Sequence, residues 1–154
     1  MDSPFCDGKG TLIEKKTHIP YRKENFEITR KMYRCDQTGL EFSTEEQDEE
    51  VVKQIYDAYR KKHGIPFPSE IKALRKKYGL SASKMSLILG FGMNQYHNYE
   101  KGEVPSLSNA KLILAAMNPE FFKTLVLLVK EDLGEKIYNQ LREVSISSPS
   151  DIAI

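Results

Sequence analysis

The sequence predicts an α+β protein in which a small antiparallel β domain at the N-terminus is followed by an all-α helix-turn-helix domain. Two observations support this division. Residues 11–42 contain short runs in which apolar and polar side chains alternate, as in half-buried strands. From Ser43 onwards, apolar residues recur at helical spacing and Gly or Pro separates short segments. We therefore expect a β domain with a connecting helix over 1–64, a helical domain over 65–143 and a flexible tail over 144–154.

The composition is that of a globular protein without a membrane segment. The chain has 154 residues, of which 40% are hydrophobic and 29% charged, enough to bury a core. Its longest apolar run, 121–129, contains Lys123 and is shorter than the about 20 residues that span a bilayer. The N-terminus has neither the basic region nor the apolar core of a secretory signal. We expect a cytoplasmic protein with no membrane partner.

The β domain is expected to contain three strands, at residues 11–19, 25–35 and 40–42. In the second, alternate positions from Phe26 to Arg34 are largely apolar and form one face. The segment that connects the first two strands contains Pro20 and Asn25, both frequent in turns. A small sheet of this kind is only marginally stable by itself, so it needs a further element to pack against.

The segment 43–64 predicts an amphipathic helix that can supply this packing. Ser43 or Thr44 is the expected N-cap, and Glu46 stands three residues after Ser43 as in a capping box. The first turns are acidic and the last turn is basic, which the helix dipole favours. An apolar stripe is expected to pack onto the sheet. It consists of Val51, Val52, Ile55, Tyr56 and Tyr59.

The helical domain is expected to contain six helices. Two prolines in residues 65–70 mark the domain boundary, and Ser69 is the expected cap of the first helix. A glycine-bounded turn at 90–92 separates the second helix from a short third helix. This is the helix-turn-helix pattern, in which the third helix enters the major groove of DNA. Residues 68–118 carry seven basic and three acidic side chains, so this part of the chain is the better candidate for binding a polyanion.

Several motifs of this domain occur at matching positions in a known family. They are Leu80 and Ser81 at the start of the second helix, Leu89 and Gly90 at its end, Tyr99, Glu100, Lys101 and Gly102 closing the third, and Pro105 and Ser106 before the fourth. Together they resemble the bacterial Xre and Cro family of DNA-binding domains. With its strand-rich N-terminal domain, the chain resembles an MqsA-type antitoxin over about residues 3–117. The resemblance implies a two-domain repressor from a bacterial toxin–antitoxin pair. In that family the N-terminal domain holds a structural zinc and binds the toxin, and the C-terminal domain binds operator DNA as a homodimer.

The resemblance also implies residues that contact double-stranded DNA. The base-reading asparagine of the family falls on Asn94, and an asparagine can pair with adenine through two hydrogen bonds. The alternative for Asn94 is a helix N-cap. The family's second base-reading residue, an arginine, falls on Asn98, which implies a different operator. Gln95 is the second candidate for a base contact. The other candidates are His97 and Tyr96, as base or phosphate contacts or as plain surface residues, and Lys84, Lys101 and Lys111 for phosphates.

Two further hypotheses concern the absence of an activity. The family's phosphate-contacting glutamine is replaced by Ala82, and together with Asn98 this leaves open a protein-interaction module that no longer binds DNA. We expect no enzyme, because no nucleophile has a paired base and there is no phosphate loop.

The apolar run 121–129 either contributes to a dimer interface or covers the core of its own domain.

The N-terminal domain contains two arms that resemble a zinc knuckle but carry one cysteine each. Ser3 and Cys6 form the first arm, and Cys35 and Thr38 the second. Structural zinc takes four Cys or His ligands and hydroxyls are poor substitutes, so we expect no metal and no cofactor. If the knuckle shape persists, the two thiols lie close together, either free or as a disulfide. The hydroxyls of Ser3 and Thr38 are then expected to bond to the turn backbones.

Overall fold

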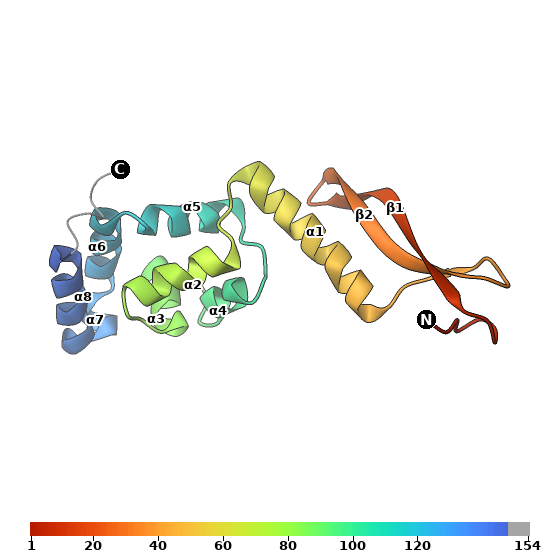
Figure 1. The fold of residues 1–154 in the computed structure, drawn as a ribbon. Helices are drawn as coiled ribbons and strands as arrows, with labels where there is room; N and C mark the ends of the chain where they lie inside the picture. The colour runs from red at the N-terminus through yellow and green to blue at the C-terminus, as the bar shows by residue number, and fades with distance from the viewer. Residues whose placement is uncertain (148–154) are drawn as a thin grey trace. The chain divides into compact units, whose positions relative to one another are not determined.

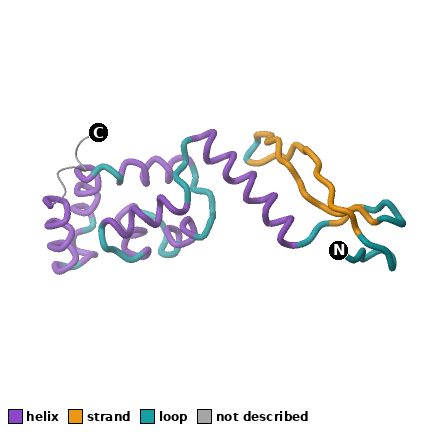
Figure 2. Tube along the Cα trace, viewed as in Figure 1, coloured by secondary structure: helices purple, strands orange, loops and turns teal. Residues whose placement is uncertain are grey.

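The computed structural model describes residues 1–147. The chain divides into two compact units, with the boundary between Lys62 and His63. The N-terminal unit contains a three-stranded antiparallel sheet and one helix, and the second unit is helical in its described residues (Figures 1 and 2). The predicted α+β arrangement is therefore confirmed. No helix of the described residues is long and apolar enough to cross a membrane.

The sheet has the order β1-β2-β3, and its first two strands form a long hairpin. The strands are β1 (Gly10–Tyr21), β2 (Glu24–Cys35) and β3 (Glu41–Phe42). The predicted connection around Pro20 and Asn25 is wrong, because these two residues pair with each other inside the hairpin. The turn is instead Arg22 and Lys23, with φ of 49° and 66°. A two-residue hairpin turn requires positive φ at both positions, which neither residue type favours.

Helix α1 (Glu45–His63) packs on the sheet through its aromatic residues, as predicted, but Val52 of the expected stripe is 44% exposed, so the prediction is wrong for that residue. The Tyr59 ring lies 5.2 Å from the Tyr21 ring and 6.0 Å from the Phe26 ring, and Tyr56 lies 5.3 Å from Tyr21. The Gln54 amide also bonds to the backbone of Thr29 in β2, accepting from its N–H at 3.1 Å and donating to its carbonyl at 2.8 Å. These contacts bury one face of the sheet and satisfy part of an open strand edge.

Helix α1 is capped by Thr44, one of the two expected N-caps, but its partner in the capping box is Gln47 and not Glu46. The Thr44 hydroxyl accepts from the Gln47 N–H at 3.2 Å, and the Gln47 side chain accepts from the Thr44 N–H at 3.0 Å. This reciprocal pair is a capping box with glutamine at the third position. Ser43 instead donates to Asp48 at 2.6 Å, so the expected role of Glu46 is wrong.

The second unit contains seven helices in its described residues. They are α2 (Pro68–Lys77), α3 (Ala82–Leu89), α4 (Gln95–Glu100), α5 (Leu107–Ala116), α6 (Pro119–Leu128), α7 (Lys130–Leu133) and α8 (Glu135–Ser147). Their core includes Tyr78, whose ring stacks on Phe122 at 3.8 Å. The run 121–129 therefore does contribute to its own core, through Phe122 and Val126, while Leu127 and Leu128 remain exposed.

Three helix ends differ from the expectation. Ser69 lies inside α2, which is capped at Phe67, has Pro68 at its first position and uses the Glu70 carboxylate to accept from the Phe67 N–H. The single helix expected after Pro119 divides into α6 and α7. Helix α8 continues to Ser147, four residues past the expected end, and the rest of the expected tail lies outside the described residues.

Candidate nucleic-acid interface and cysteine pair

Helices α3 and α4 form the helix-turn-helix, and local chemistry sets both ends of α3. The Ser81 hydroxyl accepts from the Lys84 N–H at 3.2 Å and caps the helix start. Gly90 ends the helix with φ of 78°, a left-handed conformation that glycine adopts at low cost. The turn that follows leads directly to the short helix α4, the expected reading element.

One side of α4 is anchored in the core by two tyrosines. Tyr96 is fully buried; its hydroxyl donates to the Ile71 carbonyl and its backbone N–H donates to the Ser86 hydroxyl. The suggestion that Tyr96 contacts DNA is therefore wrong. Burial, reinforced by the neighbouring Glu100 carboxylate, raises the pKa of the Tyr96 hydroxyl above its usual 10.0. Tyr99 is a core residue, and its hydroxyl accepts from Asn109 at 2.8 Å.

An ion pair fixes the C-terminal end of α4. The Arg75 guanidinium in α2 contacts the Glu100 carboxylate through Nε at 3.0 Å and through Nη2 at 3.0 Å. Arg75 also donates to the Leu80 carbonyl at 3.2 Å. The Glu100 side chain is only 7% exposed, so the charged pair is well shielded from water. The buried tyrosines and this pair together hold α4 in one orientation.

The other side of α4 presents polar side chains to solvent. Asn94, His97 and Asn98 are all exposed. The Asn94 backbone carbonyl accepts from the Asn98 N–H at 3.0 Å, but the Asn94 side chain makes no capping hydrogen bond. The structure therefore does not support the side-chain N-cap as the role of Asn94, and its amide remains on the accessible face.

Gln95 differs from its neighbours because its side chain is held within the protein. Its amide Nε2 donates to the Glu103 carboxylate at 2.6 Å, and the residue is half-buried. Glu103 is exposed in the loop that follows α4. The structure thus places a carboxylate beside the polar face of α4, whereas the sequence suggested a DNA base as the partner of Gln95.

The candidate phosphate-contacting lysines lie at different places around the helix-turn-helix. Lys84 is half-buried on α3, Lys101 is exposed at the end of α4, and Lys111 is exposed on α5. Met93, a residue for which the sequence predicted no role, is 77% exposed in the turn directly before Asn94. Met93 is an apolar residue next to the candidate reading residue in a glycine-bounded turn. This position could have indicated from the sequence that Met93 belongs to the candidate DNA-binding surface. Met93 and Lys84 are among the residues that line an open hollow of about 360 Å³ on this surface.

The four knuckle positions come together in the N-terminal unit. The Sγ atoms of Cys6 and Cys35 are 2.9 Å apart as free thiols. The Ser3 hydroxyl accepts from the Phe5 N–H at 3.2 Å, and the Thr38 hydroxyl accepts from the Leu40 N–H at 3.3 Å. The expected proximity of the thiols and the expected bonds from the hydroxyls to the turn backbones are thus confirmed.

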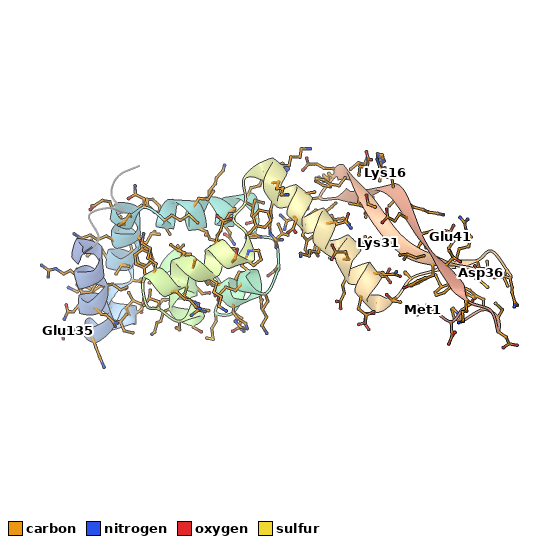
Figure 3. The ribbon with its side chains drawn as sticks, in the orientation of Figure 1. Met1, Lys16, Lys31, Asp36, Glu41 and Glu135 are labelled. Carbon is orange, nitrogen blue, oxygen red and sulfur yellow. The ribbon has the colours of Figure 1, made fainter. Side chains whose placement is uncertain are left out.

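Salt bridges connect the three strands of the sheet. Glu41 in β3 pairs with Lys15 of β1 and, at 3.2 Å, with Arg34 of β2. These cations, Lys15 first, lower the pKa of the Glu41 carboxyl below its usual 4.5. The Thr11 hydroxyl donates to the Asp36 carboxylate at 2.6 Å. Figure 3 shows Asp36 and Glu41 at the same end of the sheet.

The donors around Cys35 favour its thiolate form. Burial by itself raises the pKa of the Cys35 thiol, but hydrogen bonds from Cys6, Ser3 and Thr38 outweigh it and lower the pKa from 9.0 to about 6. The backbone N–H of Thr38 also points at the Cys35 sulfur, at 3.4 Å. These hydrogen bonds therefore favour a negative charge on the Cys35 sulfur.

The knuckle residues do not fit the zinc ion of the family that the sequence resembles. Two Zn–S bonds of about 2.3 Å at a tetrahedral angle place the sulfurs about 3.8 Å apart, whereas here they are 2.9 Å apart. The other two positions carry hydroxyls, which already accept from backbone N–H groups. Among the described residues, no group of three or more His, Cys, Asp or Glu side chains is placed to hold a metal ion.

The fold and these two features define a helix-turn-helix protein with an N-terminal knuckle unit. The chain matches the family model described as the antitoxin component of a bacterial toxin–antitoxin system, MqsA, over residues 1–125. It therefore belongs to the MqsA antitoxin family, which confirms the resemblance seen in the sequence. The match ends within α6, so α7 and α8 lie beyond it. No curated protein matches the chain.

Proposed function

We propose that this protein is a sequence-specific DNA-binding repressor and the antitoxin of a bacterial toxin–antitoxin pair, acting in the cytoplasm. One observation carries the DNA-binding proposal. Helix α4 is fixed on one side by Tyr96, Tyr99 and the Arg75–Glu100 pair, and its other side exposes amide and imidazole side chains. A rigid helix with free hydrogen-bonding groups on its accessible face is suited to reading base edges in the major groove.

In this proposal each exposed residue has a distinct role. Asn94 makes the bidentate contact with adenine, and Asn98, one turn later, contacts the neighbouring base. His97 lies on the same exposed face and bonds to a base or phosphate. Lys84 and Lys101 neutralise phosphates, which fixes the register of α4 without reading sequence. Two copies in a two-fold homodimer would place two α4 helices about 34 Å apart, on successive major grooves.

The toxin-binding part of the proposal concerns the N-terminal unit. Family membership supports a toxin partner, and the N-terminal unit is compact in its own right. With α1 covering one face of the sheet, strand β1 still carries an exposed apolar side chain, Leu12, which is 54% exposed. We propose that the toxin encoded by a neighbouring gene binds this unit, leaving α4 to bind DNA.

The test compares binding of the full chain to DNA from its own promoter by fluorescence anisotropy at low salt, where phosphate contacts are strongest. Asn94→Ala should weaken binding by about 5- to 150-fold, equivalent to about 1–3 kcal/mol for a lost bidentate base contact. The matched control is Asn139→Ala, an exposed asparagine on α8, which should bind like the unmodified protein. The unmodified protein and the Asn94→Ala variant should bind random DNA equally weakly.

The same DNA-binding comparison, together with a measurement of toxin binding, distinguishes this proposal from a second candidate function. The Gln95–Glu103 bond, which occupies a candidate base-reading side chain, favours a protein-interaction module that no longer binds DNA. Promoter DNA that binds no better than random DNA, together with retained binding of the neighbouring toxin, would select this alternative. Loss of both activities would contradict the antitoxin proposal as a whole.

A further inference from the structure

The knuckle has kept its shape while its chemistry differs from that of a metal site. Cys6 belongs to the N-terminal segment and Cys35 ends strand β2, 29 positions away, yet their sulfurs are in contact at 2.9 Å. Each sulfur also accepts a backbone N–H bond, from Gly8 at 3.3 Å and from Thr38 at 3.4 Å. Both turns are therefore built to hold sulfur at this point, and the two sulfurs face each other.

The N-terminal segment that carries Cys6 is connected to the sheet by backbone bonds and by the Phe5 ring, which lies 5.9 Å from the Phe42 ring of β3. Its backbone contacts include the bridge between Asp2 and Lys9, the bond from the Gly10 N–H to the Met1 carbonyl at 2.7 Å, and the bond from the Asp36 N–H to the Lys9 carbonyl at 2.9 Å. Small β domains with limited cores commonly need a metal or a disulfide in addition. Because the residues do not suit zinc, a covalent bond between the sulfurs is the remaining cross-link available to this unit.

We propose that Cys6 and Cys35 form a reversible disulfide in response to peroxide, which ties the N-terminal segment to the turn after β2. A disulfide has an S–S length of about 2.05 Å, so the sulfurs need to approach by less than 1 Å, about the scale of ordinary thermal motion. The inference rests on the geometry of the N-terminal unit and does not depend on DNA binding.

The chemistry uses two electrons from the thiols and hydrogen peroxide as the oxidant. The Cys35 thiolate attacks one peroxide oxygen, the O–O bond breaks, and the departing hydroxide takes a proton and leaves as water. The sulfenic acid left on Cys35 is then attacked by the Cys6 sulfur. The S–S bond forms, the S–O bond breaks, and the hydroxide leaves as a second water with the Cys6 proton. Cellular dithiols reverse the reaction by thiol–disulfide exchange.

The direct test follows both cysteines through a peroxide titration of the full chain. Reduced protein is treated with increasing hydrogen peroxide, alkylated, and analysed by intact mass and peptide mapping. Met93 serves as an internal reference, because its thioether is 77% exposed and oxidises to the sulfoxide. We expect an intramolecular Cys6–Cys35 disulfide in the monomeric chain before Met93 sulfoxide accumulates, and full recovery of both thiols with dithiothreitol.

Two variants locate the chemistry. In Cys6→Ser the disulfide cannot form, and Cys35 should accumulate as a sulfenic acid that dimedone traps. Cys35→Ser should leave Cys6 alkylatable at the same peroxide concentration. Each hydroxyl matches those already present at Ser3 and Thr38, so the fold is expected to tolerate it. Hydrogen exchange of residues 1–10 should slow by about tenfold or more in the oxidised chain, because the cross-link disfavours local opening.

Three results would overturn the proposal. The first is Met93 sulfoxide forming while both cysteines of the unmodified chain remain alkylatable. The second is a disulfide that links two chains rather than Cys6 to Cys35. The third is one zinc per chain retained through gel filtration after incubation with zinc alone, with both thiols protected from peroxide.

Discussion

Arg75 and Glu100 join α2 to the end of α4 through a doubly hydrogen-bonded ion pair, although they are 25 positions apart in the chain. The Glu100 carboxylate is almost completely shielded, while the Arg75 side chain is 23% exposed. The orientation of the candidate reading helix therefore depends on a charged pair that is only partly accessible to water. Replacing one residue leaves the charge of the other without a partner. This lowers the free energy of unfolding by more than the intact pair contributes to it.

The first prediction concerns this pair. Arg75→Ala should lower the free energy of unfolding by about 1.5–3 kcal/mol, the range for hydrogen bonds to charged groups. It should also weaken binding to promoter DNA, because α4 loses one of the contacts that fix its orientation. Urea unfolding followed by circular dichroism measures the first effect. Glu27→Gln is the control, because its salt bridge to Lys16 is highly exposed at both ends; it should change stability by less than about 0.5 kcal/mol. Equal effects of the two variants would contradict the prediction.

The second prediction concerns the carboxylate beside the reading face. Glu103→Gln removes a negative charge that lies next to Gln95 and would face the phosphates of bound DNA. We expect the affinity for promoter DNA to rise by about threefold to tenfold at low salt, as about 1 kcal/mol of charge repulsion is lost, and the gain to shrink as salt increases. Glu131→Gln, an exposed carboxylate on α7, is the control. An affinity unchanged to within twofold would show that Glu103 does not lie near the DNA.

The third prediction concerns Met93. If Asn94 binds an adenine as proposed, the exposed apolar side chain next to it is placed to contact the methyl group of a neighbouring thymine. Replacing that thymine by deoxyuridine should weaken binding of the unmodified protein by about fourfold, the value of one buried methyl group. Met93→Ala should be insensitive to the replacement. Leu128→Ala alters another side chain that is 77% exposed, and it should respond to deoxyuridine like the unmodified protein.

The fourth prediction is a pH dependence. The pKa of Tyr96 is raised above 10.0 in the folded protein, so the unfolded state loses this proton at a lower pH than the folded state. The contribution to stability is complete below about pH 10 and is lost as the pH rises through and beyond that value. Urea unfolding at several alkaline pH values should show this loss. Tyr96→Phe should be less stable at neutral pH and show a weaker decline; parallel declines would assign the loss to other groups.

Local sequence chemistry was sufficient for most elements of the fold. The three strands follow from apolar alternation, and α3 follows from Ser81 at its start and Gly90 at its end. The packing of Tyr56 and Tyr59 of α1 on the sheet follows from helical spacing. These features depend on residues that are close together in the chain. Their spacing can therefore be recognised in the sequence without knowledge of the tertiary structure.

The features that the sequence did not predict depend on partners distant in the chain or on conformations that a residue type does not favour. The hairpin turn at Arg22 and Lys23 is one, because positive φ is unusual for both residues. The full burial of Tyr96 is another, because it depends on the Ile71 carbonyl in a different helix.

The sequence by itself determined that an asparagine stands at the candidate reading position before α4 and that each knuckle arm has one thiol and one hydroxyl. Only the tertiary structure decided that Gln95 is held by Glu103 and that the thiols of Cys6 and Cys35 touch at 2.9 Å. The physical reason is that hydrogen bonds and thiol chemistry depend on distances of a few tenths of an ångström. Such distances are set by packing between segments far apart in the chain.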